Sequence, residues 1–385
     1  MKKLKVAAIA AVCVAAGASV AAIAQEYKRP AAVAVQPKPG VIPGGKLNQN
    51  LGDMDYGVCR GIDPKCYHDW PRPEGWNKEW RVLLFTHTAG PRHANIGTAF
   101  APDATLNPPL ADNNVVQREL GKLLAANNIH MDYTENPATL AGSINSYHTV
   151  IFFSTSRDNL DDGAKTALRQ YMRKGGGFVG VHNAFGTLYN WPYYEGLLGG
   201  ANYFDHPGGS RVGDVVIVDK NDTSTKGLPA RFTFKDEWYN LVPFPTHVRF
   251  LAVVDEKSII DNPGRGAAPG PQAAAAPAAP VAVAADGAAP AAAGAPGAAP
   301  GGRGGRGGAG GGAPRLPTVV GDLPGHGSFH PMAWCQYYDG GKAWMTPMGH
   351  EGLTWTDPNF PGGKEFKQML LNGIESTMGM KPFCQ

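Results

Sequence analysis

The sequence has almost no excess of charge of either sign. Its 35 lysine and arginine residues face 32 aspartate and glutamate residues, which gives a formal net charge of +3. So small an excess provides no electrostatic basis for binding nucleic acid or an anionic membrane surface. Beyond the first 24 residues no apolar run is long enough to cross a bilayer. We therefore expect neither a nucleic-acid partner nor a membrane-bound mature protein.

Cysteine is also scarce, with five residues in a chain of 385. No C-x-x-C-H motif occurs, which argues against a covalently attached haem. A zinc site built on Cys66 and His68 is the weaker alternative. Four cysteines lie beyond the N-terminal apolar run, and an even number favours disulfides if the protein is exported. Three pairings are open, of which Cys59–Cys66 with Cys335–Cys384 is favoured.

The N-terminus has the pattern of a secretory signal peptide. A short basic start, MKKLK, precedes an alanine-rich apolar run that ends in a small-x-small sequence at residues 22–24. We predict cleavage of residues 1–24, a mature chain that begins at Gln25, and a periplasmic or secreted protein. A membrane anchor is the alternative.

Composition divides the rest of the chain. Residues 25–79 are rich in proline and glycine and predict an extended arm or a disulfide-pinned cap. Residues 80–378 predict a single domain, and 379–385 a C-terminal tail. Residues 262–316 are almost wholly alanine, proline and glycine, so we expect a disordered insertion within that domain. A loop about tenfold longer costs only about 2 kcal/mol of closure entropy, so one fold can carry it.

Short apolar runs alternate with helical patterns in the predicted domain. This alternation predicts an α/β fold with a mostly parallel central sheet and helices on both faces. In such a sheet the ligand site lies at the carboxyl ends of the strands. The expected strands are 81–87, 129–134, 148–155, 177–183, 213–219, 236–242, 249–254, 332–338 and 342–347, and the expected helices are 112–127, 161–175 and 364–376.

The segment GGGFVGVHNAFGT, residues 175–187, predicts a buried strand that ends in a tight turn. Many α/β enzymes expose a nucleophile at such a turn, usually serine or cysteine. Here the apex is His182, and none of the four remaining cysteines occupies a comparable turn. The segment therefore argues against a glutamine amidotransferase or a related thiol hydrolase.

Histidines and carboxylates recur near the predicted strand ends. Six segments carry them, five of which also contain glycine or proline: THTAGPRHA, GVHNA, YFDHP, KDEWY, FHPMAW and MGHEG. A single histidine of this kind is usually structural, but six such segments favour a shared pocket.

In their order along the chain, these segments resemble the ThuA-like (trehalose utilisation) family. The resemblance rests on VLLFTHTAGPRH, GGGFVGVHNAFGT, LLGGANYFDHP, DEWY, LAVVDE and HPMAWCQYYDGGKAWMTPMGH, and it covers about residues 80–260 and 317–378. It implies the flavodoxin-like three-layer sandwich of the class I glutamine amidotransferase-like superfamily. It also implies bacterial sugar catabolism, with keto-sugars as a substrate class.

These observations yield three sets of candidate residues. The catalytic set is His93, His182 and Glu237. The substrate-binding set is Asn183, His206, Asp236, Tyr239, His330, Trp334 and His350. A divalent metal such as zinc, if present, would be held among His93, His182, His206 and His330.

Two functions follow as hypotheses. The first is an enzyme, a lyase, isomerase or hydrolase, that acts on a sugar or keto-sugar by histidine and carboxylate acid–base chemistry. The alternative is a carbohydrate-binding protein without catalytic activity. A small-molecule carbohydrate is the expected partner in both.

Overall fold

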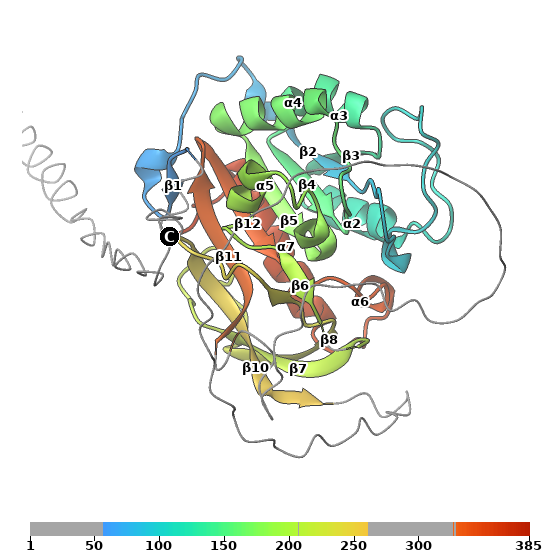
Figure 1. The fold of residues 1–385 in the computed structure, drawn as a ribbon, viewed down its shortest axis with the longest axis vertical. Coiled ribbons are helices and arrows are strands. Elements are labelled where there is room, and N and C mark those ends of the chain that lie inside the picture. Colours follow the sequence, from blue (N-terminus) through green and yellow to red (C-terminus); the bar gives the residue numbers. More distant parts are fainter. Residues whose placement is uncertain (1–56, 207, 261–325, 327–328) are drawn as a thin grey trace, which may run out of the picture.

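The computed structural model describes residues 57–206, 208–260, 326 and 329–385 (Figure 1). The predicted signal peptide, 1–24, and the predicted insertion, 262–316, lie outside the described residues. In the described part of the chain, none of the helices combines the length and apolar character needed to cross a membrane.

Five parallel strands form one half of the main sheet, in the order β3-β2-β4-β5-β12. Their bounds are β2 Trp80–Phe85, β3 Ile129–Thr134, β4 Thr149–Phe153, β5 Gly177–Val181 and β12 Gly341–Thr346. Strands β4 and β5 are buried along their whole length, as expected when helices cover both faces. The loops that follow β2, β5 and β12 therefore emerge at the same edge of the sheet.

Helices cover both faces of this half. One face carries α3 (Pro137–Ser143), α4 (Asp162–Arg173) and α5 (Pro192–Leu197), and the other carries α2 (Val115–Ala125), α6 (Leu353–Thr356) and α7 (Gly363–Met378). Alternate side chains of β2 enter the two cores, Leu83 and Phe85 on the α4 side and Val82 and Leu84 on the α7 side. The predicted three-layer α/β fold is confirmed.

The sheet continues beyond β12 with antiparallel strands, in the order β11-β10-β7-β8. Their bounds are β7 Arg211–Ile217, β8 Arg231–Asp236, β10 Arg249–Ile260 and β11 His330–Tyr338. Seven of the nine strands in the row still run in one direction, because only β11 and β7 are reversed. Phe234 of β8 stacks on Phe366 of α7 with ring centroids 5.4 Å apart, so this half curls over α7.

The curl brings the end of β8 next to the loop after β12, and the chain turns there. The sequence predicts a strand over 236–242, but β8 ends at Asp236 and only the two-residue β9 (Asn240–Leu241) follows, paired with β6 (Tyr203–Asp205). The Asp236 carboxylate accepts hydrogen bonds from the backbone amides of Glu237, Gly349 and His350, which fixes the turn at this point. The described residues also contain five short 3-10 helices: η1 Pro64–Cys66, η2 Trp76–Lys78, η3 Ala94–Ile96, η4 Ile144–Ser146 and η5 His182–Gly186.

The described part of the arm, residues 57–79, packs against the amino ends of the parallel strands. Its strand β1 (Arg60–Gly61) pairs with the carboxyl end of β11, and the ring of His148 lies 4.4 Å from Trp76 and 4.6 Å from Trp80. Trp70, in contrast, is half exposed. The arm therefore lies at the opposite edge of the sheet from the loops after β2, β5 and β12.

The glycines before β5 fit this contact. Gly175 has φ +83°, and a Cβ there would lie 2.3 Å from the carbonyl oxygen of His68 in the arm. At Gly177 a Cβ would lie 2.2 Å from the Thr149 hydroxyl of the neighbouring strand. Larger side chains are excluded at both positions. Glycine at these positions therefore lets α4 end and lets β5 pack closely between its neighbouring strands.

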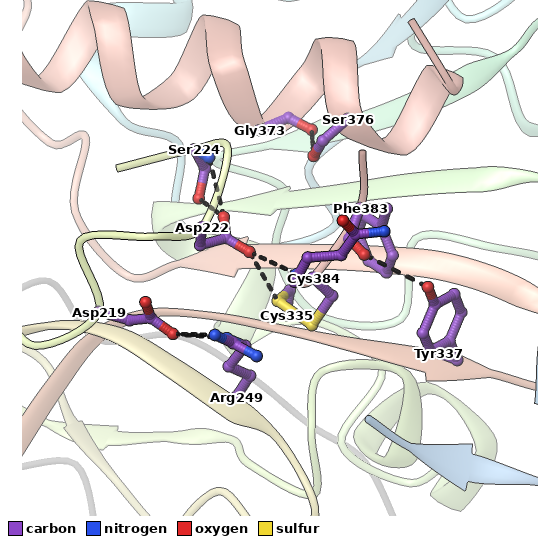
Figure 2. Close-up of a disulfide and its surroundings, with 11 residues drawn as sticks. Asp219, Asp222, Ser224, Arg249, Cys335, Tyr337, Gly373, Ser376, Phe383 and Cys384 are labelled. Carbon is purple, nitrogen blue, oxygen red and sulfur yellow. Dashed lines mark hydrogen bonds and ion pairs between the residues drawn. A yellow bond between two sulfur atoms is a disulfide. The ribbon is translucent and has the colours of Figure 1, made fainter. Parts of the chain in front are cut away.

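Two disulfides connect Cys59 to Cys66 and Cys335 to Cys384, which is the pairing the sequence favoured. The second one holds the C-terminal tail against β11, and Figure 2 shows it between Asp222 and the segment around Phe383. The Tyr337 hydroxyl donates to the carbonyl oxygen of Phe383 at 3.3 Å. The last residues are thus part of the packed domain.

Loop length predicts unequal contributions of the two disulfides to stability. Cross-linking residues 49 apart should contribute about 4 kcal/mol, and cross-linking residues 7 apart about 2 kcal/mol. We expect the double substitution Cys335→Ala/Cys384→Ala to lower the free energy of unfolding more than Cys59→Ala/Cys66→Ala does. Denaturant titration of both variants tests this, and a larger loss for the Cys59–Cys66 pair would contradict it.

Candidate functional site

His182 stands at the tip of the turn after β5, and its ring is fully buried. Its φ of +53° lies in the left-handed region, a conformation that costs a non-glycine residue about 1–3 kcal/mol and often marks functional turns. The ring Nδ1 donates to the carbonyl oxygen of Pro347 at 3.0 Å. Because that oxygen can only accept, Nδ1 carries the proton, and Nε2 presents its lone pair to the Tyr239 hydroxyl 3.0 Å away.

Four side chains converge at this point: His93, His182, Glu237 and His350. Each offers one ligand atom, and these four atoms lie within 4.8 Å of one another. They come from the loops after β2, β5, β8 and β12, four strands that run in the same direction. His350 Nδ1 lies 3.1 Å from Glu237 Oε2 and 3.3 Å from His182 Nε2.

Burial keeps two of the imidazoles neutral. It lowers the pKa of His93 to about 4, and the neighbouring His350 adds to this effect. It also holds the pKa of His182 well below its ordinary value, with the His93 and His350 rings acting in the same direction. Both rings therefore present a basic nitrogen rather than a positive charge at neutral pH.

Glu237 and His350 form a hydrogen-bonded pair at the edge of the cluster, with Nδ1 and Oε2 3.1 Å apart. Burial alone would raise the pKa of Glu237, but the hydrogen bond and charge of His350 hold it below its usual value. Burial alone would lower the pKa of His350, and the same hydrogen bond raises it. The site thus places an ionised carboxylate beside two neutral imidazoles.

Asp236 orients the cluster from behind. Its side chain is fully buried, and its carboxylate accepts from the backbone amides of Glu237 at 2.8 Å, Gly349 at 2.5 Å and His350 at 3.0 Å. The Asn95 side chain donates to the carbonyl oxygen of Gly349 at 2.7 Å, which connects the His93 loop to the same point. Asp236 thus positions the backbones of Glu237, Gly349 and His350.

Tyr239, Asn183 and His206 surround the four ligand atoms. The Tyr239 hydroxyl lies 3.5 Å from both His93 Nε2 and Asn183 Oδ1, in addition to its contact with His182. Burial raises the pKa of Tyr239 well above 10, and the charge of Glu237 adds to this, so the hydroxyl keeps its proton. The His206 ring stacks on Tyr239 with centroids 5.6 Å apart, and its Nε2 lies 3.8 Å from Glu237 Oε2.

A cavity of about 690 Å³ lies near the cluster, although none of the four converging side chains lines it. Tyr203 joins the two, because it lines the cavity and its ring lies 4.5 Å from that of Tyr239. The other walls are mainly aromatic and polar. They include Asp158, Tyr189, Asn190, Glu195 and Asp205. Such a lining suits a neutral, hydroxyl-rich ligand better than an apolar or strongly charged one.

The sequence model of the family described as "ThuA: Trehalose utilisation" matches residues 81–291, more than half of the chain. The chain belongs to the ThuA family. The resemblance stated from the sequence motifs is thereby confirmed. No curated protein matches the chain.

Solved structures similar to this ThuA-family chain include two ThuA-like proteins. The one from Bacteroides uniformis is 16% identical, with 81% of this chain and 100% of that chain covered and a TM-score of 0.48. The one from Parabacteroides merdae is 15% identical, with 80% and 92% covered and a TM-score of 0.47. A β-galactosidase from Rahnella sp. R3 is 14% identical, with 79% and 32% covered and a TM-score of 0.39.

Two histidines of the sequence motifs, His330 and His87, lie away from the ThuA-family cluster or behind it, as does His326, which is outside those motifs. Both ring nitrogens of His330 are occupied, Nδ1 by Glu256 at 3.0 Å and Nε2 by the carbonyl oxygen of Tyr239 at 2.8 Å. His330 is therefore not brought into the predicted metal set, and it positions Tyr239. His326 stacks on His330, and His87 contacts the carbonyl oxygen of Asn159.

Trp334 lies in the core of the ThuA-family domain. It is fully buried, packs on Phe185 and donates through Nε1 to the carbonyl oxygen of Leu198 at 2.9 Å. Trp334 thus packs in the core and anchors the end of α5. Sequence reasoning missed most of the cavity wall, although the dense aromatic and polar segment YNWPYYEG at residues 189–196 was a usable signal.

The support behind Tyr239 is predicted to weaken in acid. His326 Nε2 accepts from the Leu241 amide at 2.9 Å, and burial lowers the pKa of His326 to about 3. With an unfolded pKa of about 6.5, the unfolded chain binds more protons between pH 6.5 and 3, so stability falls as the pH falls through this window.

The variant His326→Gln keeps an acceptor for Leu241 but cannot be protonated. We expect the unfolding free energy of the wild type, relative to this variant, to drop by about 3 kcal/mol between pH 7 and pH 4. Denaturant titrations at several pH values measure this difference. Parallel pH curves for the two proteins would show that His326 does not contribute in this way.

Proposed function

We propose that this ThuA-family protein is an enzyme that acts on a sugar or keto-sugar by acid–base chemistry at the His182 cluster. One observation carries the proposal. A neutral, buried imidazole presents its Nε2 3.0 Å from a protonated tyrosine hydroxyl, with an ionised carboxylate, Glu237 Oε2, 3.9 Å from the same nitrogen.

These groups suit proton transfer at a carbon next to a carbonyl. Tyr239 can donate its hydrogen bond to a sugar carbonyl oxygen, where negative charge develops. His182 Nε2, released from that hydrogen bond, can accept the proton from the adjacent carbon. Glu237 stabilises the imidazolium that results, and His93 lies close enough to Tyr239 to orient it. Proton transfer of this kind serves a lyase or an isomerase.

The cavity beside the cluster supports a carbohydrate as the substrate. Tyr189 and Tyr203 offer aromatic faces on which a sugar ring can pack, and Asp158 and Asn190 offer polar groups for its hydroxyls. Its volume of about 690 Å³ is within the usual range for small-molecule sites. A disaccharide could place one ring in the cavity and the other at the cluster, past Tyr203.

We also propose that the protein works outside the cytoplasm. Two disulfides, one in the arm and one between β11 and the C-terminal tail, favour an oxidising compartment, in line with the signal peptide predicted from the sequence. The competing function, carbohydrate binding without catalysis, has the cavity in its favour, because the cavity does not depend on the protonation of the cluster.

Removal of His182 separates the two functions. We expect His182→Ala to lower the turnover of 3-keto-disaccharides by about 10²–10⁴-fold, the usual contribution of a general acid or base, while sugar binding persists. Product formation is followed by chromatography, and folding by circular dichroism. The control is His130→Gln, which replaces a histidine on the far edge strand β3. Sugar binding without turnover by the wild type would favour the binding protein.

The cavity predicts a second, separable effect. We expect Asp158→Asn to raise KM by about tenfold with little change in kcat, because one charge-assisted hydrogen bond to a sugar hydroxyl is lost. Asp162→Asn, on the first turn of α4 and outside the cavity wall, is the matched control. An unchanged KM in Asp158→Asn would place the substrate elsewhere.

A further inference from the structure

We infer that His93, His182, His350 and Glu237 bind one divalent transition-metal ion of the zinc class. The inference goes beyond the proposed function, because a His182 Nε2 that binds the ion cannot at the same time accept a substrate proton, and the binding site is argued from geometry alone. The set differs from the one expected from the sequence, because Glu237 and His350 take the places of His206 and His330.

The spacing of the ligand atoms fits a four-coordinate ion. Ligand atoms 2.0–2.1 Å from a tetrahedral ion lie about 3.3 Å from one another. His350 Nδ1 lies 3.1 Å from Glu237 Oε2 and 3.3 Å from His182 Nε2, and the third separation, His182 Nε2 to Glu237 Oε2, is 3.9 Å. All four atoms lie within 4.8 Å. Small side-chain rotations would bring them around one centre.

The ligands are held by groups that usually support metal sites. A metal-binding histidine commonly donates its other ring nitrogen to a carbonyl or carboxylate oxygen, which fixes the tautomer. His182 does this through Nδ1 to the carbonyl oxygen of Pro347, leaving Nε2 unprotonated. Asp236 holds the backbones of Glu237 and His350 at once. Two ligands thus share one buried anchor.

His93 provides an independent indication. Its Nδ1 atom is buried without a hydrogen-bond partner among the described residues, and its ring meets His182 and His350 edge-on at 4.6 Å and 5.3 Å. Three imidazole rings and one carboxylate face one another here. Together they offer several nitrogen and oxygen lone pairs but few hydrogen-bond donors. A cation at their centre satisfies those lone pairs together.

The donor set selects the class of ion. Three imidazole nitrogens and one carboxylate oxygen suit zinc, cobalt or nickel, whereas magnesium and calcium prefer oxygen ligands. A bound ion of this class would act as a Lewis acid on a sugar carbonyl or hydroxyl oxygen. Tyr239, whose hydroxyl is 3.0 Å from His182 Nε2 and 3.5 Å from His93 Nε2, borders the position where such an oxygen would sit.

The test is metal binding by the full purified chain, independent of turnover. After chelator treatment and dialysis against Zn²⁺, we expect about one zinc ion per chain by elemental analysis. The Co²⁺-loaded protein should show the intense visible absorption of four-coordinate cobalt. His93→Gln, Glu237→Gln and His350→Gln should each weaken zinc binding at least about tenfold. His206→Gln, which alters the neighbouring histidine outside the set, should retain it.

Two outcomes would overturn the inference: zinc content well below one ion per chain, or ligand variants that bind zinc like the wild type. Failure of the proposed function looks different. One bound zinc without turnover of any keto-sugar would leave the metal site in place and remove the enzymatic proposal. Turnover of a keto-sugar by a protein that binds well below one zinc ion per chain would leave the enzymatic proposal in place and remove the metal site.

Discussion

The buried carboxylate of Asp236 connects the two halves of the sheet. It ends β8 in the antiparallel half and accepts amide hydrogen bonds from Gly349 and His350, which follow β12 in the parallel half. The residues it joins are more than 110 positions apart in the sequence. Without these bonds Glu237 would have no fixed place beside His350. An unpaired carboxylate in this position would also carry a large desolvation cost, so the curl of the antiparallel half over α7 and the geometry of the site depend on one another.

The turn after β5 keeps the geometry of a nucleophile elbow while changing its chemistry. His182 adopts the left-handed backbone typical of such turns, and its ring is oriented by a backbone carbonyl instead of by a catalytic partner. This arrangement gives a fixed lone pair in a buried site. A serine or cysteine there would need a base to activate it, whereas a neutral imidazole is itself the base or the ligand. The same backbone can thus carry a different reaction.

Local sequence pattern was sufficient for the parallel half and insufficient for the rest. Strands β4 and β5 are continuous apolar runs, and α4 has an acidic N-cap and a terminal glycine, so each is visible within about fifteen residues. The end of β8 is not visible in the local sequence, because the backbone amides that fix it belong to the distant 349–350 loop. Local sequence pattern is equally insufficient to predict which histidines enter the cluster. His350 and His330 stand in similar contexts, beside glycine or proline near a strand end, yet one enters the cluster and the other pairs with Glu256.

That pairing explains why the antiparallel half belongs to the site. His330 and Glu256 are both buried, and the ring of His330 spans from the Glu256 carboxylate to the backbone carbonyl of Tyr239. Tyr239 is the residue whose hydroxyl reaches His182, so a chain of contacts runs from β10 through β11 to the elbow on β5. A bare parallel sheet would supply only His93, His182 and His350. The carboxylate and the tyrosine, which turn three imidazoles into an acid–base or metal-binding centre, come from the segment after β8 that the antiparallel strands hold in place.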